Sequence, residues 1–162
     1  MKECVPQECV PLWSSEDGQV LSVQKTEVET NEILYLDISK TPSDQAVDKI
    51  TEIMAFYFEN NACNFAFVTR HVKTTHLENI SVSLCLQILQ ACMKHHAFKR
   101  VQHIIMQCLE VDTNAQLAAN MFTLTTKRSL TMTTQEEEVQ EILRKWVKKS
   151  KKEMKESLRI NP

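Results

Sequence analysis

The segment ACNFAFVTRHV, residues 62–72, determines which of two folds this chain can adopt. As a β-strand, it forms a β-α-β unit with Ile33–Ile38, another short apolar segment. As an α-helix, it is the second half of a helical hairpin. Neither end of the segment is marked by a glycine, although tight turns commonly depend on one. We therefore favour the helix and keep the strand as the alternative.

Glycine is almost absent from the chain. The only one is Gly18, so residues 19–162 contain none, whereas average usage is about 7%. Phosphate-binding loops, dinucleotide-binding turns and type I′ hairpins depend on glycine for positive φ or close backbone approach. The sequence therefore excludes a P-loop and a dinucleotide-binding fingerprint, and it argues against a β-sandwich.

The N-terminal residues 1–40 differ from the rest. Glu3–Pro6 is repeated as Glu8–Pro11, and Gln19–Val28 and Ile33–Ile38 alternate well enough to be short strands. Two isolated strands are only marginally stable. We therefore predict an extended or irregular segment, partly disordered, that packs on the following domain.

Helix start signals recur from residue 41 onward. Thr41–Asp44 supplies an N-cap, a proline and an acid for a first turn, and Thr75–Glu78 forms a capping box. Thr113–Gln116 repeats the capping pattern, and apolar residues in Val101–Leu109 recur at i, i+3, i+4, i+7 and i+8. These signals predict a series of amphipathic helices.

The last of these helices is predicted over residues 134–159. Four acids between 136 and 141 come first and its lysines follow, an order that suits the helix dipole. The fold class is therefore all-α: residues 41–162 form a domain of stacked antiparallel helical hairpins, either α-solenoid-like or an irregular helical bundle. The extended segment 1–40 precedes it.

An internal repeat supports the hairpins. A shift of 35 residues places Ile53–Met54 on Ile88–Leu89, and the polar pair Asn60–Asn61 on His95–His96. A period near 35 residues with two helices per unit is typical of stacked helical-hairpin repeats.

Residues 86–106 (LQILQACMKHHAFKRVQHIIM) combine an apolar helix, a short polar link and a second amphipathic helix. This pattern resembles a pentatricopeptide-type hairpin, and the resemblance to pentatricopeptide and tetratricopeptide-like repeats extends over residues 79–110. The resemblance implies a helical-repeat scaffold. The signature Trp, Gly, Tyr and Pro positions of tetratricopeptide repeats are missing, and a plain bundle remains the alternative.

Metal binding has one conceivable arrangement, in which Cys92, His96, His103 and Cys108 converge from two adjacent helices. No C-x-x-C pair accompanies them, and cysteines in apolar stripes are usually buried core residues. We therefore predict no metal site. No cofactor motif is present, and no Ser, Cys or His stands in a recognisable nucleophile context. The sequence predicts a protein that is not an enzyme and has no cofactor.

Charge is distributed unevenly. Residues 144–160 hold eight Lys and Arg and two Glu, a net +6, whereas the whole chain is −2, so residues 1–143 carry −8. Such a cluster attracts phosphates or an acidic partner, although the simplest interpretation is a solvated helix face. The candidate contact residues for nucleic acid or a partner are Arg144, Lys145, Lys148, Lys149, Lys151, Lys152 and Lys155.

The first residues, MKECVPQECV, contain charges and prolines but no apolar run, and no segment approaches the ~18 apolar residues of a membrane span. We expect a cytoplasmic or nuclear protein with reduced cysteines and no membrane partner.

The predicted function is that of a non-catalytic helical interaction module that binds another protein, as a fragment or isoform of a larger helical-repeat protein. The alternative is an RNA-binding helical-repeat protein that uses the basic C-terminal helix. A salt-sensitive affinity for nucleic acid distinguishes the second hypothesis from the first.

Overall fold

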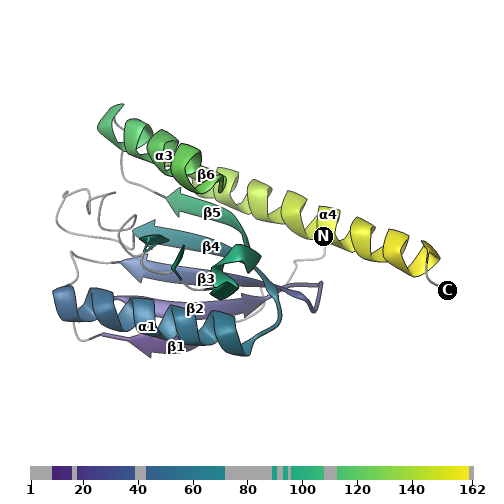
Figure 1. Ribbon diagram of the computed structural model, residues 1–162, viewed down its shortest axis with the longest axis horizontal. Helices are drawn as coiled ribbons and strands as arrows, with labels where there is room; N and C mark the ends of the chain where they lie inside the picture. The colour runs from purple at the N-terminus through teal and green to yellow at the C-terminus, as the bar shows by residue number, and fades with distance from the viewer. Residues whose placement is uncertain are drawn as a thin grey trace.

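Figure 1 shows the computed structural model, which describes residues 9–15, 18–38, 43–71, 89–90, 93–94, 96–107 and 113–160. Its elements along the chain are β1 (Val10–Ser14), β2 (Val20–Lys25), β3 (Asn31–Ile38), α1 (Asp44–Asn60), β4 (Asn64–His71), the 3₁₀ helix η1 (His96–Arg100), β5 (Val101–Gln107), α3 (Thr113–Thr126), β6 (Leu130–Thr133) and α4 (Glu136–Ile160). The fold is a mixed α/β fold. The prediction of an all-α solenoid or helical bundle is wrong.

The six strands form one sheet whose order, β1-β2-β3-β4-β5-β6, follows the chain. Strands β1, β2 and β3 pair antiparallel, and β3, β4, β5 and β6 pair parallel. Parallel neighbours need crossover connections, which α1 provides between β3 and β4 and α3 provides between β5 and β6.

The segment 62–72 contains strand β4, so the favoured helix is wrong and the alternative β-α-β unit is correct. Ile33 pairs with Ala66 and Tyr35 pairs with Val68 in a continuous parallel register. Phe65, Ala66, Phe67 and Val68 are all buried, although successive side chains point to opposite faces. Burial on both faces is typical of an interior parallel strand.

The lack of glycine did not prevent a sheet, because the connections that the structure describes hardly use the left-handed region. Among the described residues, positive φ occurs only at Gly18 (88°) and Lys127 (58°). Helix α1 ends at Asn61 with φ −132° and ψ 116°, an extended conformation that any residue adopts.

The segment 79–110, which was interpreted as a repeat hairpin, contains η1 and strand β5 instead. A β-bulge explains the misleading spacing: Phe65 pairs with Val101, but the next residue, Ala66, pairs with His103. The extra residue, Gln102, places Val101 and Ile104 on the same sheet face although they are three positions apart. Two apolar residues three positions apart therefore lie on the same face here, as they would in a helix, although the segment is a strand. Residues 79–88, 91–92, 95 and 108–110 lie outside the described residues.

Three sequence expectations at the level of elements agree with the structure. The alternating patterns of Gln19–Val28 and Ile33–Ile38 correspond to strands β2 and β3, although both strands belong to the six-stranded sheet and not to an extended or irregular segment packed on a helical domain. The helix expected after Thr41 is α1, where the Ser43 hydroxyl caps the N-terminus by accepting from the Ala46 amide at 3.2 Å. The long last helix is α4.

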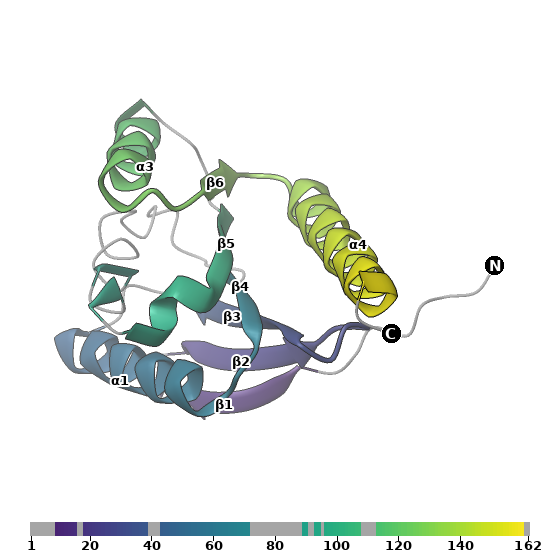
Figure 2. The same cartoon turned by 45° about the vertical axis from the view of Figure 1, so that its right-hand side comes forward.

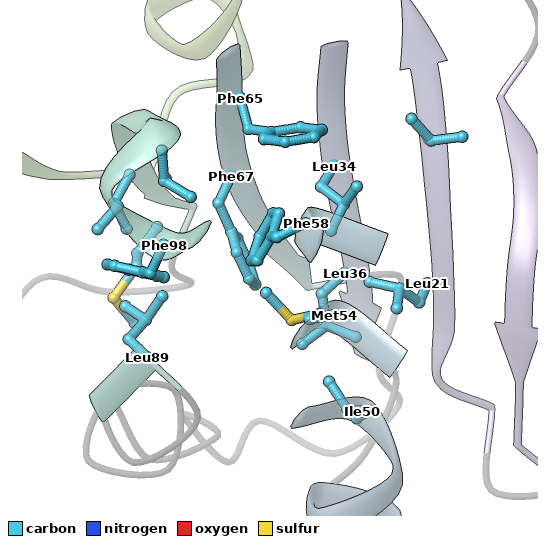
Figure 3. Packing of buried hydrophobic residues seen from close by; sticks show 14 of the residues in the cluster. Leu21, Leu34, Leu36, Ile50, Met54, Phe58, Phe65, Phe67, Leu89 and Phe98 are labelled. Carbon is cyan, nitrogen blue, oxygen red and sulfur yellow. The ribbon is translucent and has the colours of Figure 1, made fainter. Parts of the chain in front are cut away.

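The sheet has an apolar layer on each face (Figure 2). Helices α1 and α3 lie on one face together with η1, and α4 lies on the other. Figure 3 shows the larger layer, in which Phe58 of α1 packs against Phe65 with ring centroids 4.9 Å apart. The smaller layer holds Val139, Leu143 and Trp146 of α4 against the central strands.

Candidate binding surfaces

Helix α4 is fixed to the sheet by polar contacts as well as by its apolar side. The indole Nε1 of Trp146 donates to Gln102 Oε1 at 2.7 Å, and Asn31 Nδ2 donates to Ser150 Oγ at 2.7 Å. These contacts set the rotation of α4 about its axis. They therefore determine which charged side chains of α4 lie beside the sheet and which face solvent.

The basic residues predicted as a contact cluster all lie on α4, and all seven are exposed. The seven residues lie on two different sides of the helix. Arg144, Lys148 and Lys151 line a groove beside the helix, and the other members, Lys145, Lys149, Lys152 and Lys155, are outside it.

We define the α4 groove by the residues that line this hollow of about 560 Å³. One wall is a single face of α4, formed by residues at i, i+3, i+4, i+7, i+8 and i+11: Gln140, Leu143, Arg144, Val147, Lys148 and Lys151. The sheet provides the floor and the other wall, from the end of β2, the turn that follows it and β3: Gln24, Lys25, Thr26, Glu27, Ile33 and Tyr35.

Cations dominate the rim of the α4 groove. Arg144, Lys148 and Lys151 on the α4 wall face a single acid, Glu27, whose Oε2 is 3.5 Å from Lys151 Nζ. Arg144 pairs with Glu141 of the same helix, Nη1 to Oε2, at 2.6 Å. In the part of the chain that the structure describes, Lys25 and Lys148 form no ion pair.

A pair of oppositely charged side chains lies beside Tyr35, which lines the α4 groove. Arg70 of β4 binds Asp37 of β3 in two-pronged fashion, with Nε–Oδ1 and Nη2–Oδ2 distances of 2.6 and 3.0 Å. The same guanidinium lies 4.0 Å from the ring centroid of Tyr35, and burial raises the pKa of this phenol to about 12. The guanidinium of Arg70 is therefore held by Asp37. Tyr35, which lines the groove, is uncharged at physiological pH.

Helix α3 presents a second surface of different chemistry. Its inner side buries Ala119 and Phe122, but Leu117, Met121 and Leu124 are 57%, 60% and 81% exposed. These three residues, which we call the α3 stripe, recur at i, i+4 and i+7 and therefore share one side of the helix. All fourteen residues of α3 are uncharged.

The α3 stripe was not predicted from the sequence, although a signal for it exists. A helix that packs one side on a core usually has its apolar residues on that side only. Helix α3 also has apolar residues on the side that does not face the core. Lys25 was missed as well. It lies far from the basic helix in the sequence, and only the pairing of β2 with β3 brings it to the groove.

The residues considered for metal binding do not converge within the described ranges, where no group of three His, Cys, Asp or Glu is placed to hold an ion. His96 is exposed on η1, and His103 of β5 faces Trp146 at a centroid distance of 6.2 Å. Cys92 and Cys108 lie outside the described residues. None of the helices in those ranges is long and apolar enough to cross a bilayer.

Comparison with known proteins gives one partial likeness. No family model matches the sequence, and no curated protein does. Among solved structures, a chain in the crystal structure of the diguanylate cyclase SiaD in complex with its activator SiaC from Pseudomonas aeruginosa matches with a TM-score of 0.41 and 8% identity. The match covers 76% of this chain and 98% of that chain.

Proposed function

We propose that this chain is a non-catalytic domain that binds another protein through the α3 stripe. The observation that carries the proposal is the pairing of two features in α3: three large apolar side chains on one exposed side, and no charged residue in fourteen. Interface centres have this composition, because charged residues are depleted there and large apolar ones are enriched.

Exposure of the α3 stripe has a free-energy cost that a partner removes. Burying a fully exposed Leu or Met contributes about 1.5–3 kcal/mol, and these side chains are more than half exposed. Covering all three therefore contributes on the order of 4 kcal/mol. This is a sizeable share of the free energy of a micromolar complex, about 8 kcal/mol.

The partner surface that fits the α3 stripe is an uncharged apolar helix face. An opposing charge would lose its hydration without gaining an ion partner, since α3 offers none. Stripe residues at i, i+4 and i+7 form the ridge that packs between side chains of a second helix. The stripe is much smaller than the ~800 Å² per partner of a standard interface, so it forms the centre of a larger contact with the partner.

The test compares two matched double substitutions. Leu117→Gln with Leu124→Gln removes apolar surface from α3 without adding charge and keeps a good helix former at both positions. Met154→Gln with Leu158→Gln is the control, because these α4 residues are also exposed (42% and 68%) and lie on another surface. Proteins retained from a lysate by wild type and control, but not by the α3 variant, are purified and titrated against all three by calorimetry.

The expected outcome is direct binding to a purified protein that the α3 variant weakens by about tenfold or more, while the control changes it by less than about twofold. Melting temperatures of the three proteins establish that the fold is retained. A purified partner that binds the α3 variant as tightly as wild type would contradict the proposal, and so would a lysate in which no protein depends on Leu117 and Leu124.

A further inference from the structure

We infer that the α4 groove is a second docking site, and that its ligand is an acidic amphipathic helix of a partner protein. The inference does not rest on the α3 stripe, which lies on a helix on the other face of the sheet (Figure 2). It concerns a different ligand chemistry and can be tested separately.

The shape of the α4 groove fits a helix. Its α4 wall runs from Gln140 to Lys151, twelve residues whose Cα atoms span about 16 Å, which is the length of three helical turns. The opposite wall is β2 and the turn that follows it, and the Lys151–Glu27 ion pair joins the two walls at one end. A helix can lie in this hollow parallel to α4, as helices lie in the grooves of helix-binding domains.

An extended peptide is a poorer occupant. Adding a strand to a sheet requires an edge with free backbone groups. Strand β2 forms the groove wall but already pairs with β1 on one side and with β3 on the other. A ligand in the α4 groove must therefore satisfy its own backbone hydrogen bonds, which a helix does.

The floor provides contact for apolar residues of the ligand. Ile33 of the sheet and Leu143 of the α4 wall are almost fully buried, and Val147 of the same wall is partly exposed, so together they form a shallow apolar strip at the bottom of the groove. Tyr35 and Gln140 add polar contacts at one end, where Gln140 Nε2 donates to Glu136 Oε1 at 3.0 Å. Such a strip holds one side of an amphipathic helix.

The rim selects the charge of the ligand. The cations that face the α4 groove are Arg144, Lys148 and Lys151, all on the α4 wall, and the one acid, Glu27, lies on the sheet wall. Lys25 lines the groove only at the strand end, because its partner in the sheet register, Glu32, points to α1. A helix in the groove meets positive charge on the side of α4, so acidic residues on that edge of its apolar strip are matched. Exposed rim charges act mainly through the association rate and are screened by salt.

The experiment measures binding of a defined probe. The probe is a fluorescently labelled, end-blocked peptide of about 14 residues with Leu at i, i+3, i+4 and i+7 and Glu elsewhere, about four helical turns. A scrambled peptide of the same composition is compared with it. Binding of both to the full chain is followed by anisotropy, and circular dichroism reports whether the probe becomes helical.

Matched charge reversals locate the site. Lys148→Glu with Lys151→Glu alters the groove, and Lys149→Glu with Lys152→Glu makes the same change in net charge on another side of the same helix. We expect the groove variant to weaken probe binding at least about tenfold and the control to weaken it by less than about threefold. Raising the salt from ~50 to ~200 mM weakens binding to wild type severalfold.

Several results overturn the inference. They are equal losses in the two variants, equal affinity for the scrambled peptide, or no saturable binding of the probe. Anionic vesicles and single-stranded RNA are further arms: binding to either that exceeds probe binding and falls equally in both variants identifies α4 as a general polyanion-binding surface. Leu117→Gln with Leu124→Gln leaves probe binding unchanged, which separates failure of this inference from failure of the proposed function.

Discussion

At the scale of single residues, the least expected side chain in the sheet is a buried acid. Glu32 of β3 is 5% exposed, and the hydroxyl of Tyr57 on α1 donates to its Oε1 at 2.7 Å. Burial, together with the hydrogen bond to Glu32 and the charge of Glu32, raises the pKa of Tyr57. The phenol therefore stays protonated at neutral pH and remains a donor to the carboxylate.

We predict that Tyr57→Phe lowers the free energy of unfolding by about 1–3 kcal/mol, because it leaves a buried carboxylate oxygen without this donor. Glu32→Gln tests the same contact from the other side, and the double variant closes a thermodynamic cycle with a coupling of about 0.5–3 kcal/mol. Urea unfolding at neutral pH measures all four proteins. Phe56→Leu, at the 67% exposed neighbouring position, is the control and changes stability by less than about 0.5 kcal/mol. Additive effects of the two substitutions would show that the contact contributes nothing.

At the scale of elements, the contact between α4 and β5 depends on pH. His103 of β5 lies against Trp146 of α4, and burial, followed by the charge of Lys149, lowers the pKa of its imidazole. A group whose pKa is lower in the folded state binds fewer protons there than in the unfolded state between the two pKa values. The stability that His103 provides is therefore complete above pH ~6.5 and is lost as the pH falls through its lowered pKa.

We predict that Lys149→Gln raises the pKa of His103, because it removes the second of the two causes. Burial remains, so the value stays below ~6.5. The measurement is a titration of the His103 imidazole by NMR in wild type and variant. Lys152→Gln, which removes the same charge one turn farther along α4, is the control and moves the pKa less. A pKa that Lys149→Gln leaves unchanged, or one that it lowers, would contradict the electrostatic argument.

The elements also show what the sequence could predict and why the rest was missed. Helices α1 and α4 were predicted because their caps and apolar stripes are local signals. Strand β5 was missed because its bulge at Gln102 produces helical spacing, and β4 was misassigned because no glycine marks its ends, although its connection to α1 needs none. The basic side of α4 was visible in the sequence. The α4 groove was not, since Lys25 and Tyr35 reach it only through strand pairing.

At the scale of the whole molecule, the two apolar layers differ in size. Among the described residues, sixteen buried residues form the cluster between the sheet and α1, η1 and α3, and eight form the cluster beneath α4 (Figure 2). Helix α4 supplies three buried residues, Val139, Leu143 and Trp146, and the partly buried Ile142 and Val147 to its cluster, and residues 151–158 are all exposed. The α4 layer is therefore the weaker one, and it bears the α4 groove.

This asymmetry predicts that α4 detaches from the sheet without global unfolding. In hydrogen exchange, amides of residues 151–158 exchange fastest, those of residues 139–150 exchange by detachment of the helix, and those of β3 and β4 exchange only on global unfolding. Trp146→Ala deletes the largest α4 contact, at a cost of about 3–5 kcal/mol. Both detachment of α4 and global unfolding break this contact, so the substitution accelerates exchange in residues 139–150 and in β3 alike, by about a hundredfold or more. Phe58→Ala in the other layer accelerates exchange in β3 and leaves residues 139–150 almost unchanged, because detachment of α4 does not break the Phe58 contacts. Equal acceleration of α4 and β3 by Phe58→Ala would show that the two layers unfold as one unit, in which case the α4 groove is as rigid as the sheet beneath it.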